Sequence, residues 1–249
     1  MNESSSETFD LHGATLSYPT FFRDGHSAMG LFAVPAGPAD RILADTPFSA
    51  ARIAPGLTAC SLVCVHYSDT DCGEYLEIAV AFFVDPFRSG DRLRIPYLST
   101  WRDVLSGEIA SHTWLLPVST ELARDAGIFM WGFPKHIAEL DHEQLPETAN
   151  FTWIEDGELV LRFSMPTGGH RNQPEISPPV YSLLDGRPVA SRLTQRYSGV
   201  AHHVGGGSLE LGTHPTADRL RALGLPKRPV VATWNGHLSF EMSAPESLD

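Results

Sequence analysis

Lysine is rare in this chain, and its two copies have different surroundings. It occurs only at Lys135 and Lys227, while the other strongly basic residues are arginine. An arginine side chain stays charged, whereas a lysine amine can lose its proton and act as a nucleophile. Lys227 lies in the sequence Pro-Lys-Arg-Pro, which is typical of a solvated turn. Lys135 is therefore the candidate nucleophile.

An apolar stretch at residues 128 to 133 precedes Lys135. Apolar neighbours remove water from an amine, which disfavours its charged form and leaves a neutral amine able to attack a carbonyl. We expect Met130, Trp131 and Phe133 to line a substrate pocket beside this amine. The alternative is a structural role, in which a lysine at the end of a buried strand extends its amine to solvent.

Glu77 is the second candidate for chemistry, because it lies just before the apolar stretch 78 to 84. Such a stretch is typical of a central strand, where burial favours a neutral carboxyl that can act as general acid or base. The alternative is a carboxylate at a strand end that pairs with an arginine. Alternation places Tyr75 on the same face as Glu77, where it could orient substrate, and Glu74 on the other face.

His136 follows Lys135 directly and is a candidate substrate contact. A protonated imidazole would favour the neutral amine by charge repulsion, and a neutral one could carry protons. In an extended segment, however, its side chain would point away from Lys135, which favours a structural role. Arg192 and Arg196 are candidates for binding a substrate carboxylate by residue type alone.

The three cysteines are interpreted as buried thiols, because their number is odd and two of them lie in an apolar stretch. A zinc site made by Cys60, Cys64, His66 and Cys72 is conceivable from the residue types, and it requires a strand without a bulge. We expect no metal and no cofactor. The sequence contains no Gly-x-Gly-x-x-Gly turn before a helix and no Walker-type lysine.

The elements that position these residues follow from the spacing of short apolar runs, which are separated by Gly, Pro, Asp and Asn. This pattern of short apolar runs and turn residues predicts a β-rich domain. Helices are predicted at 39–44, 120–126 and 215–223. We expect a flexible N-terminus at 1–10, one domain over 11–245 and a tail at 246–249. Strands are predicted within 28–34, 59–66, 75–84, 113–118, 151–154, 159–165 and 230–234.

The overall composition predicts a soluble cytoplasmic protein. The formal net charge is -12, whereas nucleic-acid binding needs clustered positive charge. No apolar run approaches the roughly 20 residues that span a bilayer. The first residues also lack the basic and apolar regions of a signal peptide. We therefore expect neither a nucleic-acid partner nor a membrane.

The segment 127–136, Gly-Ile-Phe-Met-Trp-Gly-Phe-Pro-Lys-His, resembles the Schiff-base segment of acetoacetate decarboxylases. That segment typically reads Gly-Arg-Glu-x-x-Gly-Tyr-Pro-Lys-Lys. Tyr-Leu-Glu at 75–77 resembles the family's Tyr-x-Glu, and His66 lies upstream at nearly the family's spacing. The resemblance implies an α+β fold: a β-rich single domain with an antiparallel or mixed β-barrel and a few peripheral helices. It also implies a homo-oligomer and an imine-forming Lys135.

The chain departs from the family pattern at several polar positions. Ile128 and Phe129 stand where the family carries Arg and Glu, and His136 stands where it carries a second lysine. Carbonyl capture is retained, but the next step could be decarboxylation, aldol chemistry with dehydration, or cyclisation. We expect a divergent lyase of secondary metabolism; the alternative is a non-catalytic ligand-binding protein. Upstream, a family glutamate falls near Ser61, and a substrate-facing arginine falls near His26 or Ser27.

Overall fold

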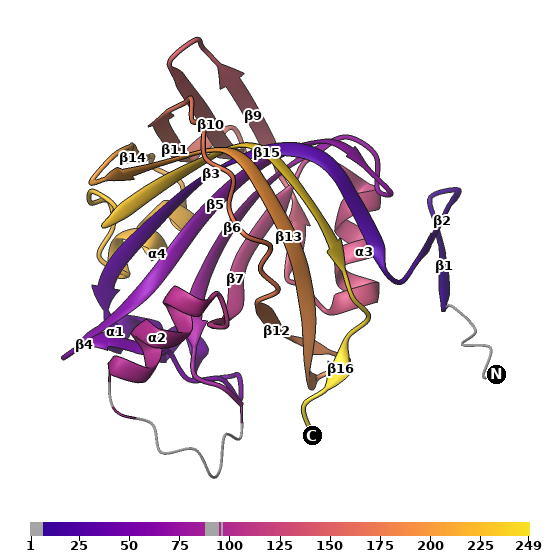
Figure 1. Ribbon diagram of the computed structural model, residues 1–249, viewed down its shortest axis with the longest axis horizontal. Helices are drawn as coiled ribbons and strands as arrows, with labels where there is room; N and C mark the ends of the chain where they lie inside the picture. Colours follow the sequence, from indigo (N-terminus) through magenta and orange to yellow (C-terminus); the bar gives the residue numbers. More distant parts are fainter. Residues whose placement is uncertain (1–6, 88–94, 96) are drawn as a thin grey trace.

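The computed structural model describes residues 7–87, 95 and 97–249. Seven strands hydrogen-bond into a closed ring in the order β12, β13, β15, β3, β5, β6 and β7 (Figure 1). Neighbouring ring strands are antiparallel, except that β12 closes the ring by pairing in parallel with β7. The ring strands are β3 (Thr20–Pro35), β5 (Leu57–Thr70), β6 (Tyr75–Val84), β7 (Ala110–Val118), β12 (Pro179–Leu184), β13 (Arg187–Val204) and β15 (Val231–Met242).

A second sheet has four strands in the order β14, β11, β10 and β9. Its strands are β9 (Glu139–Gln144), β10 (Thr148–Glu155), β11 (Glu158–Pro166) and β14 (Ser208–Leu211). Phe151 and Phe163 of this sheet are buried in one cluster with Phe32 and Phe82 of the ring. The remaining strands are short: β1 (Thr8–Leu11) pairs with β2 (Ala14–Ser17), β4 (Arg52–Ala54) with β5, β8 (Lys135–Ile137) with β7, and β16 (Glu246–Ser247) with β13.

Alternation along β5 separates two apolar layers. Cys60 and Cys64 face the cluster that is shared with the second sheet. Val65 and Tyr67 face a different cluster, which draws residues from β3, β5, β6, β7, β13 and β15. Because strands from all around the ring meet in this second cluster, it fills the inside of the ring. We call it the inner cluster, and we call the other the outer cluster.

Four helices lie within the described residues: α1 (Ala36–Leu43), α2 (Leu98–Ser106), α3 (Glu121–Trp131) and α4 (Pro215–Ala222). Helix α3 begins after Thr120, whose side chain accepts a hydrogen bond from the Ala123 N–H, as an N-cap residue does. Its buried face, including Ala126 and Met130, packs on the inner cluster. Helix α3 therefore covers one end of the ring (Figure 1).

The predicted β-rich α+β architecture is confirmed, and each predicted strand lies within or overlaps an observed one. The predicted helices correspond to α1, α3 and α4. Helix α3 continues through Trp131, so the stretch before the lysine is helical. Helix α2 was not predicted, because Tyr97 gives it no side-chain cap.

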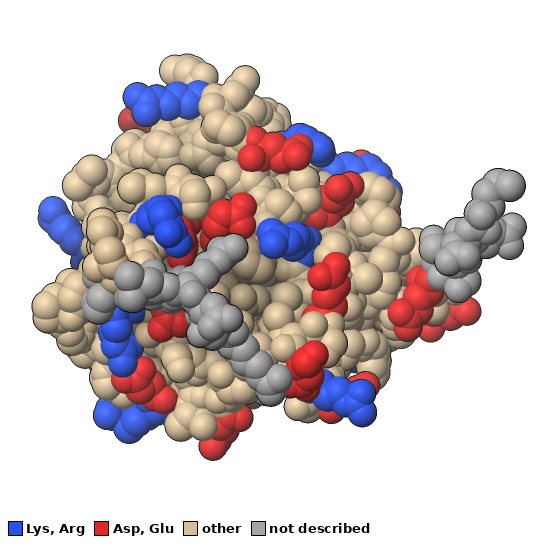
Figure 2. Space-filling view, turned by 60° about the horizontal axis from the view of Figure 1, so that its bottom comes forward, with Lys and Arg blue, Asp and Glu red and all other residues tan. Residues whose placement is uncertain are grey.

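The two predicted end segments include short strands. Residues 8 to 10 belong to β1 and residues 246 to 247 form β16, whereas residues 1 to 6 lie outside the described residues. No helix in the described part of the chain has the length and hydropathy needed to cross a membrane. On the face shown in Figure 2, Lys and Arg are interspersed with Asp and Glu rather than gathered in one basic patch.

Candidate active site

Lys135 is placed by a sharp junction between a helix and a strand. Helix α3 ends at Gly132, whose φ of 66° lies in the left-handed region. The N–H groups of Gly132 and Phe133 donate to carbonyls of the last helical turn. A Cβ at Gly132 would lie 2.2 Å from the Leu183 carbonyl oxygen, so both conformation and space require glycine. The chain then enters β8, where Lys135 pairs with Leu116 of β7.

Gly127, inside α3, makes room for the lysine side chain. A Cβ at this position would lie 2.3 Å from Lys135 Cδ and 2.6 Å from Cε. Glycine weakens a helix by about 1 kcal/mol relative to alanine. Here it lets the lysine stem run along the helix backbone, and close packing leaves that stem little freedom to move. Helix α3 thus both covers the lysine and fixes the direction of its side chain.

The amine of Lys135 contacts the carboxylate of Glu77. Nζ lies 2.7 Å from Glu77 Oε2, and only 8% and 13% of the two side chains are exposed. The contact crosses β7, because Glu77 pairs with Val118 while β8 pairs with the other edge of that strand. Opposite charges enclosed in this way satisfy each other. The ring centre of Tyr75 lies 5.3 Å from Nζ, so the amine has a carboxylate and an aromatic ring beside it.

Two buried phenols and a thiol surround this carboxylate. The Tyr67 hydroxyl donates to Glu77 Oε1 at 3.3 Å. Burial, followed by the nearby charge of Glu77, raises the pKa of Tyr67 and of Tyr75 well above the usual value. Burial also raises the pKa of Cys72 to about 11. The phenols and the thiol are therefore neutral near pH 7, and the phenols can donate hydrogen bonds.

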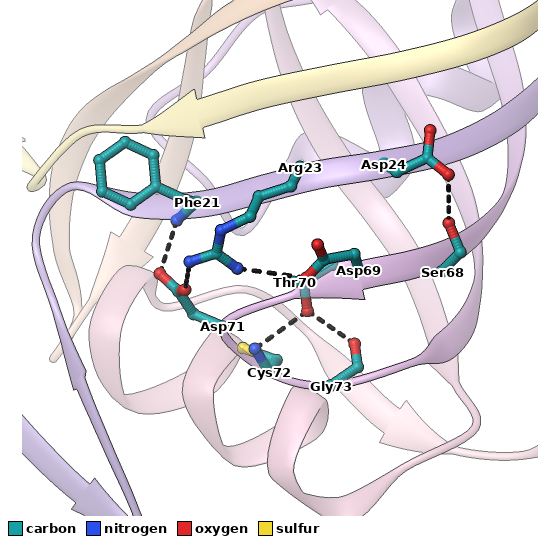
Figure 3. Close-up of polar contacts among 9 residues, drawn as sticks. All are labelled: Phe21, Arg23, Asp24, Ser68, Asp69, Thr70, Asp71, Cys72 and Gly73. Carbon is teal, nitrogen blue, oxygen red and sulfur yellow. Dashed lines mark hydrogen bonds and ion pairs between the residues drawn. The ribbon is translucent and has the colours of Figure 1, made fainter.

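The turn between β5 and β6 carries Cys72 and leads into the strand of Glu77. Figure 3 shows how the turn is fixed: Arg23 of β3 forms ion pairs with Asp69 and Asp71. The Thr70 hydroxyl accepts a hydrogen bond from the Cys72 N–H at 2.9 Å. These contacts tie the turn to a neighbouring ring strand and so hold the start of β6 in place.

Met130, Trp131 and Phe133, the predicted pocket residues, lie in or against the inner cluster. Met130 is fully buried, and the Trp131 indole N–H donates to the Ser243 carbonyl at 2.9 Å. The rings of Trp131 and Phe133 stack with centres 6.4 Å apart. The structure thus brings these side chains and Tyr75 into the cluster that encloses the lysine. That they contact a substrate remains a prediction.

His136 is not brought to the amine. Its Nε2 lies 3.6 Å from Glu155 Oε1, and its ring centre lies 5.8 Å from that of Trp153 in the second sheet. Consecutive residues of β8 point to opposite faces, so His136 contacts the outer side while Lys135 points inward. The predicted structural role of His136 is therefore the one that this geometry favours.

Ile128 and Phe129 also point away from the lysine. They are 36% and 57% exposed, and they line a surface groove of about 700 Å³ together with residues of β1 and β12. The sequence interpretation linked their departure from the family pattern to altered chemistry at Lys135. The structure contradicts that link, because the two side chains lie on the outward face of α3.

Arg192 and Arg196, the predicted carboxylate-binding residues, lie on the outer surface. Each is more than half exposed, and Arg196 Nη2 lies 2.6 Å from Glu175 Oε2. Their neighbours on β13, Leu193 and Tyr197, pack against the inner cluster. Alternation therefore turns both arginines away from the lysine, and this geometry does not favour the predicted role in binding a substrate carboxylate.

The conceivable zinc site at the cysteines is not assembled. Cys60 and Cys64 lie in the outer cluster, whereas Cys72 lies in the inner cluster. All three are free and buried, which confirms the interpretation as buried thiols. Burial raises the pKa of Cys60 to about 12, so this thiol is a poor metal ligand at neutral pH.

Sequence reasoning missed Gly127, Tyr67 and Cys72 as neighbours of the reactive pair. A glycine inside a helix was one available signal, because such a residue often marks a close approach by another element. Tyr67 also alternates in phase with Val65 on β5 and so faces the same side. For Cys72 no local signal existed, since its position depends on how the turn folds over the ring.

Comparison with known proteins gives a family match and several similar structures. A family model described as acetoacetate decarboxylase (ADC) matches residues 17–238. No curated protein matches the sequence. Acetoacetate decarboxylase from Legionella pneumophila is similar in structure, with a TM-score of 0.69 at 16% identity, covering 93% of this chain and 87% of that chain.

Two further solved structures extend the similarity to other enzymes. The enduracididine biosynthesis enzyme MppR, complexed with the condensation product of pyruvate and imidazole 4-carboxaldehyde, has a TM-score of 0.67 at 14% identity, covering 100% of this chain and 99% of that chain. An acetoacetate decarboxylase-like enzyme from Sphingomonas wittichii RW1 has a TM-score of 0.57 at 15% identity, covering 98% and 99%. At these identities the similarity establishes the fold.

Proposed function

The chain belongs to the acetoacetate decarboxylase family, and on that premise we propose that Lys135 captures the carbonyl of a small ketone or keto acid as an imine. The observation that carries the proposal is the enclosed contact between Lys135 Nζ and Glu77 Oε2 at 2.7 Å. A lysine in this environment can form an imine if a nearby group accepts a proton from its ammonium. Glu77 is the proton acceptor within hydrogen-bond distance of the amine.

Imine formation begins with proton transfer from the Lys135 ammonium to the Glu77 carboxylate. The neutral Nζ adds to the carbonyl carbon, and one of its protons passes to the former carbonyl oxygen, which becomes the hydroxyl of a carbinolamine. The Glu77 carboxyl returns its proton to this hydroxyl, which leaves as water, and a cationic imine remains. Glu77 ends as the carboxylate that faces the new positive charge.

The cationic imine accepts the electron pair of the next bond that breaks. Loss of carbon dioxide or of a proton from the adjacent carbon gives an enamine. The Tyr67 phenol donates to Glu77 Oε1, and the Tyr75 phenol can donate a hydrogen bond to a substrate oxygen as the charge moves. Met130, Trp131 and Phe133 supply an apolar surface around the reacting carbons, which limits access of water.

Two overall reactions that pass through the imine are the main candidates. Decarboxylation is the activity in the family name. Condensation followed by dehydration is supported by the similarity to MppR, whose structure holds a condensation product of pyruvate and an aldehyde. Release of carbon dioxide from acetoacetate would identify the first reaction. An ultraviolet-absorbing product from pyruvate and an aldehyde would identify the second. Cyclisation of a single substrate is the intramolecular form of that second reaction.

The test of carbonyl capture is reductive trapping. The protein is mixed with a panel of ketones and keto acids in the presence of borohydride, and intact-mass and peptide mass spectrometry locate the adduct. We expect one adduct per chain at Lys135, none on Lys135→Arg, and no change for Lys227→Arg, the only other lysine. Absence of any adduct across the panel would contradict the proposal and favour a non-catalytic ligand-binding protein.

We also propose that the protein is a homo-oligomer and that it acts in the cytoplasm in secondary metabolism. Light scattering combined with size-exclusion chromatography tests the first of them. A single species at the mass of one chain would contradict it.

A further inference from the structure

Three histidines meet on the outer side of the ring, away from the lysine. His26 of β3 and His66 of β5 are direct partners across the two antiparallel strands. His142 of β9 reaches them from the second sheet, so the cluster spans the junction between the two sheets. None of the three takes part in the proposed carbonyl chemistry. Although His26 and His142 are 116 residues apart in the sequence, the fold brings them into contact.

The ring nitrogens lie at distances suited to a shared ion. One nitrogen from each of His26, His66 and His142 lies within 4.8 Å of the other two. The two Nε2 atoms of His26 and His142 are 3.1 Å apart. Two nitrogens bound to one tetrahedral zinc at about 2.0–2.1 Å lie roughly 3.4 Å apart. Small side-chain rotations would bring all three nitrogens into contact with one ion.

The imidazoles are held in place by apolar packing on the outer cluster. The His26 ring centre lies 5.4 Å from that of Trp234, and the His142 ring centre lies 4.5 Å from that of Phe151. Burial and the neighbouring histidines lower the pKa of His26 to about 4, and burial also lowers the pKa of His142. An imidazole in its neutral form carries one nitrogen lone pair, which metal binding requires.

A carboxylate supports the third ligand. His66 Nε2 lies 2.8 Å from Glu74 Oε1. Histidine ligands commonly form such a contact with a carboxylate, which orients the ring and strengthens its binding to the metal. Glu74 also brings a carboxylate beside the proposed site. The cluster therefore has both donor atoms and a compensating charge.

From these observations we propose that His26, His66 and His142 bind one divalent transition-metal ion of the zinc class. Three imidazoles and one open position suit zinc, and imidazole also suits cobalt and nickel. The ion would tie β9 to β3 and β5, and so fasten the second sheet to the ring. This site is independent of the proposed carbonyl chemistry, because Lys135 and Glu77 lie on the inner side.

The test uses the full chain without a histidine tag, stripped with EDTA and titrated with Zn²⁺ by calorimetry and with Co²⁺ by visible absorption. We expect one ion per chain with a Kd of about 1 µM or tighter, and cobalt bands typical of tetrahedral nitrogen ligation. His142→Phe keeps an aromatic ring against Phe151 but removes a ligand. It should weaken binding by at least about 100-fold, and Glu74→Gln should weaken it by about 10-fold.

The matched control is His112→Phe. His112 is also partly buried, and its ring centre lies 4.8 Å from that of Phe48, but it lies outside the cluster. This variant should bind metal as the wild type does. A zinc-dependent rise in Tm, reversed by EDTA and lost in His142→Phe, gives a second readout. Absence of saturable binding at 100-fold the expected Kd, or equal affinity in the wild type and His142→Phe, would overturn the proposal.

Discussion

His66 and Tyr67 are consecutive residues of β5, yet they belong to different centres. Tyr67 faces the inside of the ring and donates to Glu77, the partner of Lys135. His66 faces outward and meets His26 across the strand pair. The inner centre is a charged pair enclosed by one end of the ring. The outer centre is a group of imidazoles at the junction of two sheets.

The contrast between the two centres reflects what each side of a sheet can offer. Inside the ring, strands converge and exclude water, so a lysine and a carboxylate are held against each other at 8% and 13% exposure. Outside, the cluster depends on a second sheet that supplies His142. The two centres thus lie on opposite sides of β5 and draw on different elements. The two centres should therefore respond separately to substitution.

The largest expected effect in this comparison comes from Glu77→Gln. Loss of the proton acceptor should slow imine formation by about 10²- to 10⁴-fold, while affinity for Zn²⁺ stays unchanged. The free energy of unfolding should also fall, by up to about 3 kcal/mol, because Lys135 loses its counter-charge. Rates of adduct formation, metal titration and urea unfolding measure the three quantities. An equal loss at both centres would show that they are coupled.

Gly127→Ala tests whether helix α3 aims the amine. Alanine favours a helix, but its Cβ would lie 2.3 Å from Lys135 Cδ, so the lysine must move. We expect adduct formation to slow by at least about 10-fold, because small misplacements of a reacting group are costly. Zinc binding should not change.

Gly37→Ala is the matched control for that substitution. Gly37 is also helical, and a Cβ at this position would have as its nearest neighbour beyond the helix backbone the end of the Arg41 side chain, 3.8 Å away. This variant should retain the wild-type rate. A wild-type rate in Gly127→Ala would show that the lysine stem can take another path to the carbonyl.

The smallest expected effect is that of Ile128→Arg combined with Phe129→Glu, which restores the residues typical of the family. Both side chains are exposed on the outward face of α3. We expect less than a twofold change in adduct formation, and a change in unfolding free energy within about 0.5 kcal/mol. A change of 10-fold or more in the rate would show that this surface influences the lysine after all.

Much of the inner centre could be predicted from the sequence. Lys135 was singled out by its rarity and its apolar neighbours, and alternation placed Tyr75 and Glu77 on one face of a strand. The contact between Lys135 and Glu77 was not predictable from local pattern, because it crosses β7. The role of Ile128 and Phe129 was misjudged, since their stretch is helical and a helix turns successive residues in different directions.

The grouping of three histidines in the outer centre was not predicted, although His66 was considered as a zinc ligand. His26, His66 and His142 are far apart in the sequence and show none of the short spacings that mark metal sites within one element. The sequence interpretation grouped His66 with the cysteines instead, but Cys60 and Cys64 face the outer cluster and Cys72 lies in a turn against the inner cluster. A ligand set drawn from two sheets has no local sequence pattern, because each of the three strands contributes only one of the ligands.

The sequence by itself determined the β-rich architecture, three of the four helices in the described residues, and the identity of the candidate nucleophile. These depend on local periodicity, capping and residue chemistry, which neighbouring residues carry. The tertiary structure alone decided which carboxylate meets Lys135 and which histidines meet one another. It also decided that His136, Arg192 and Arg196 face away. Those outcomes depend on strand register and on closure of the ring, and both are fixed by packing between segments remote in sequence.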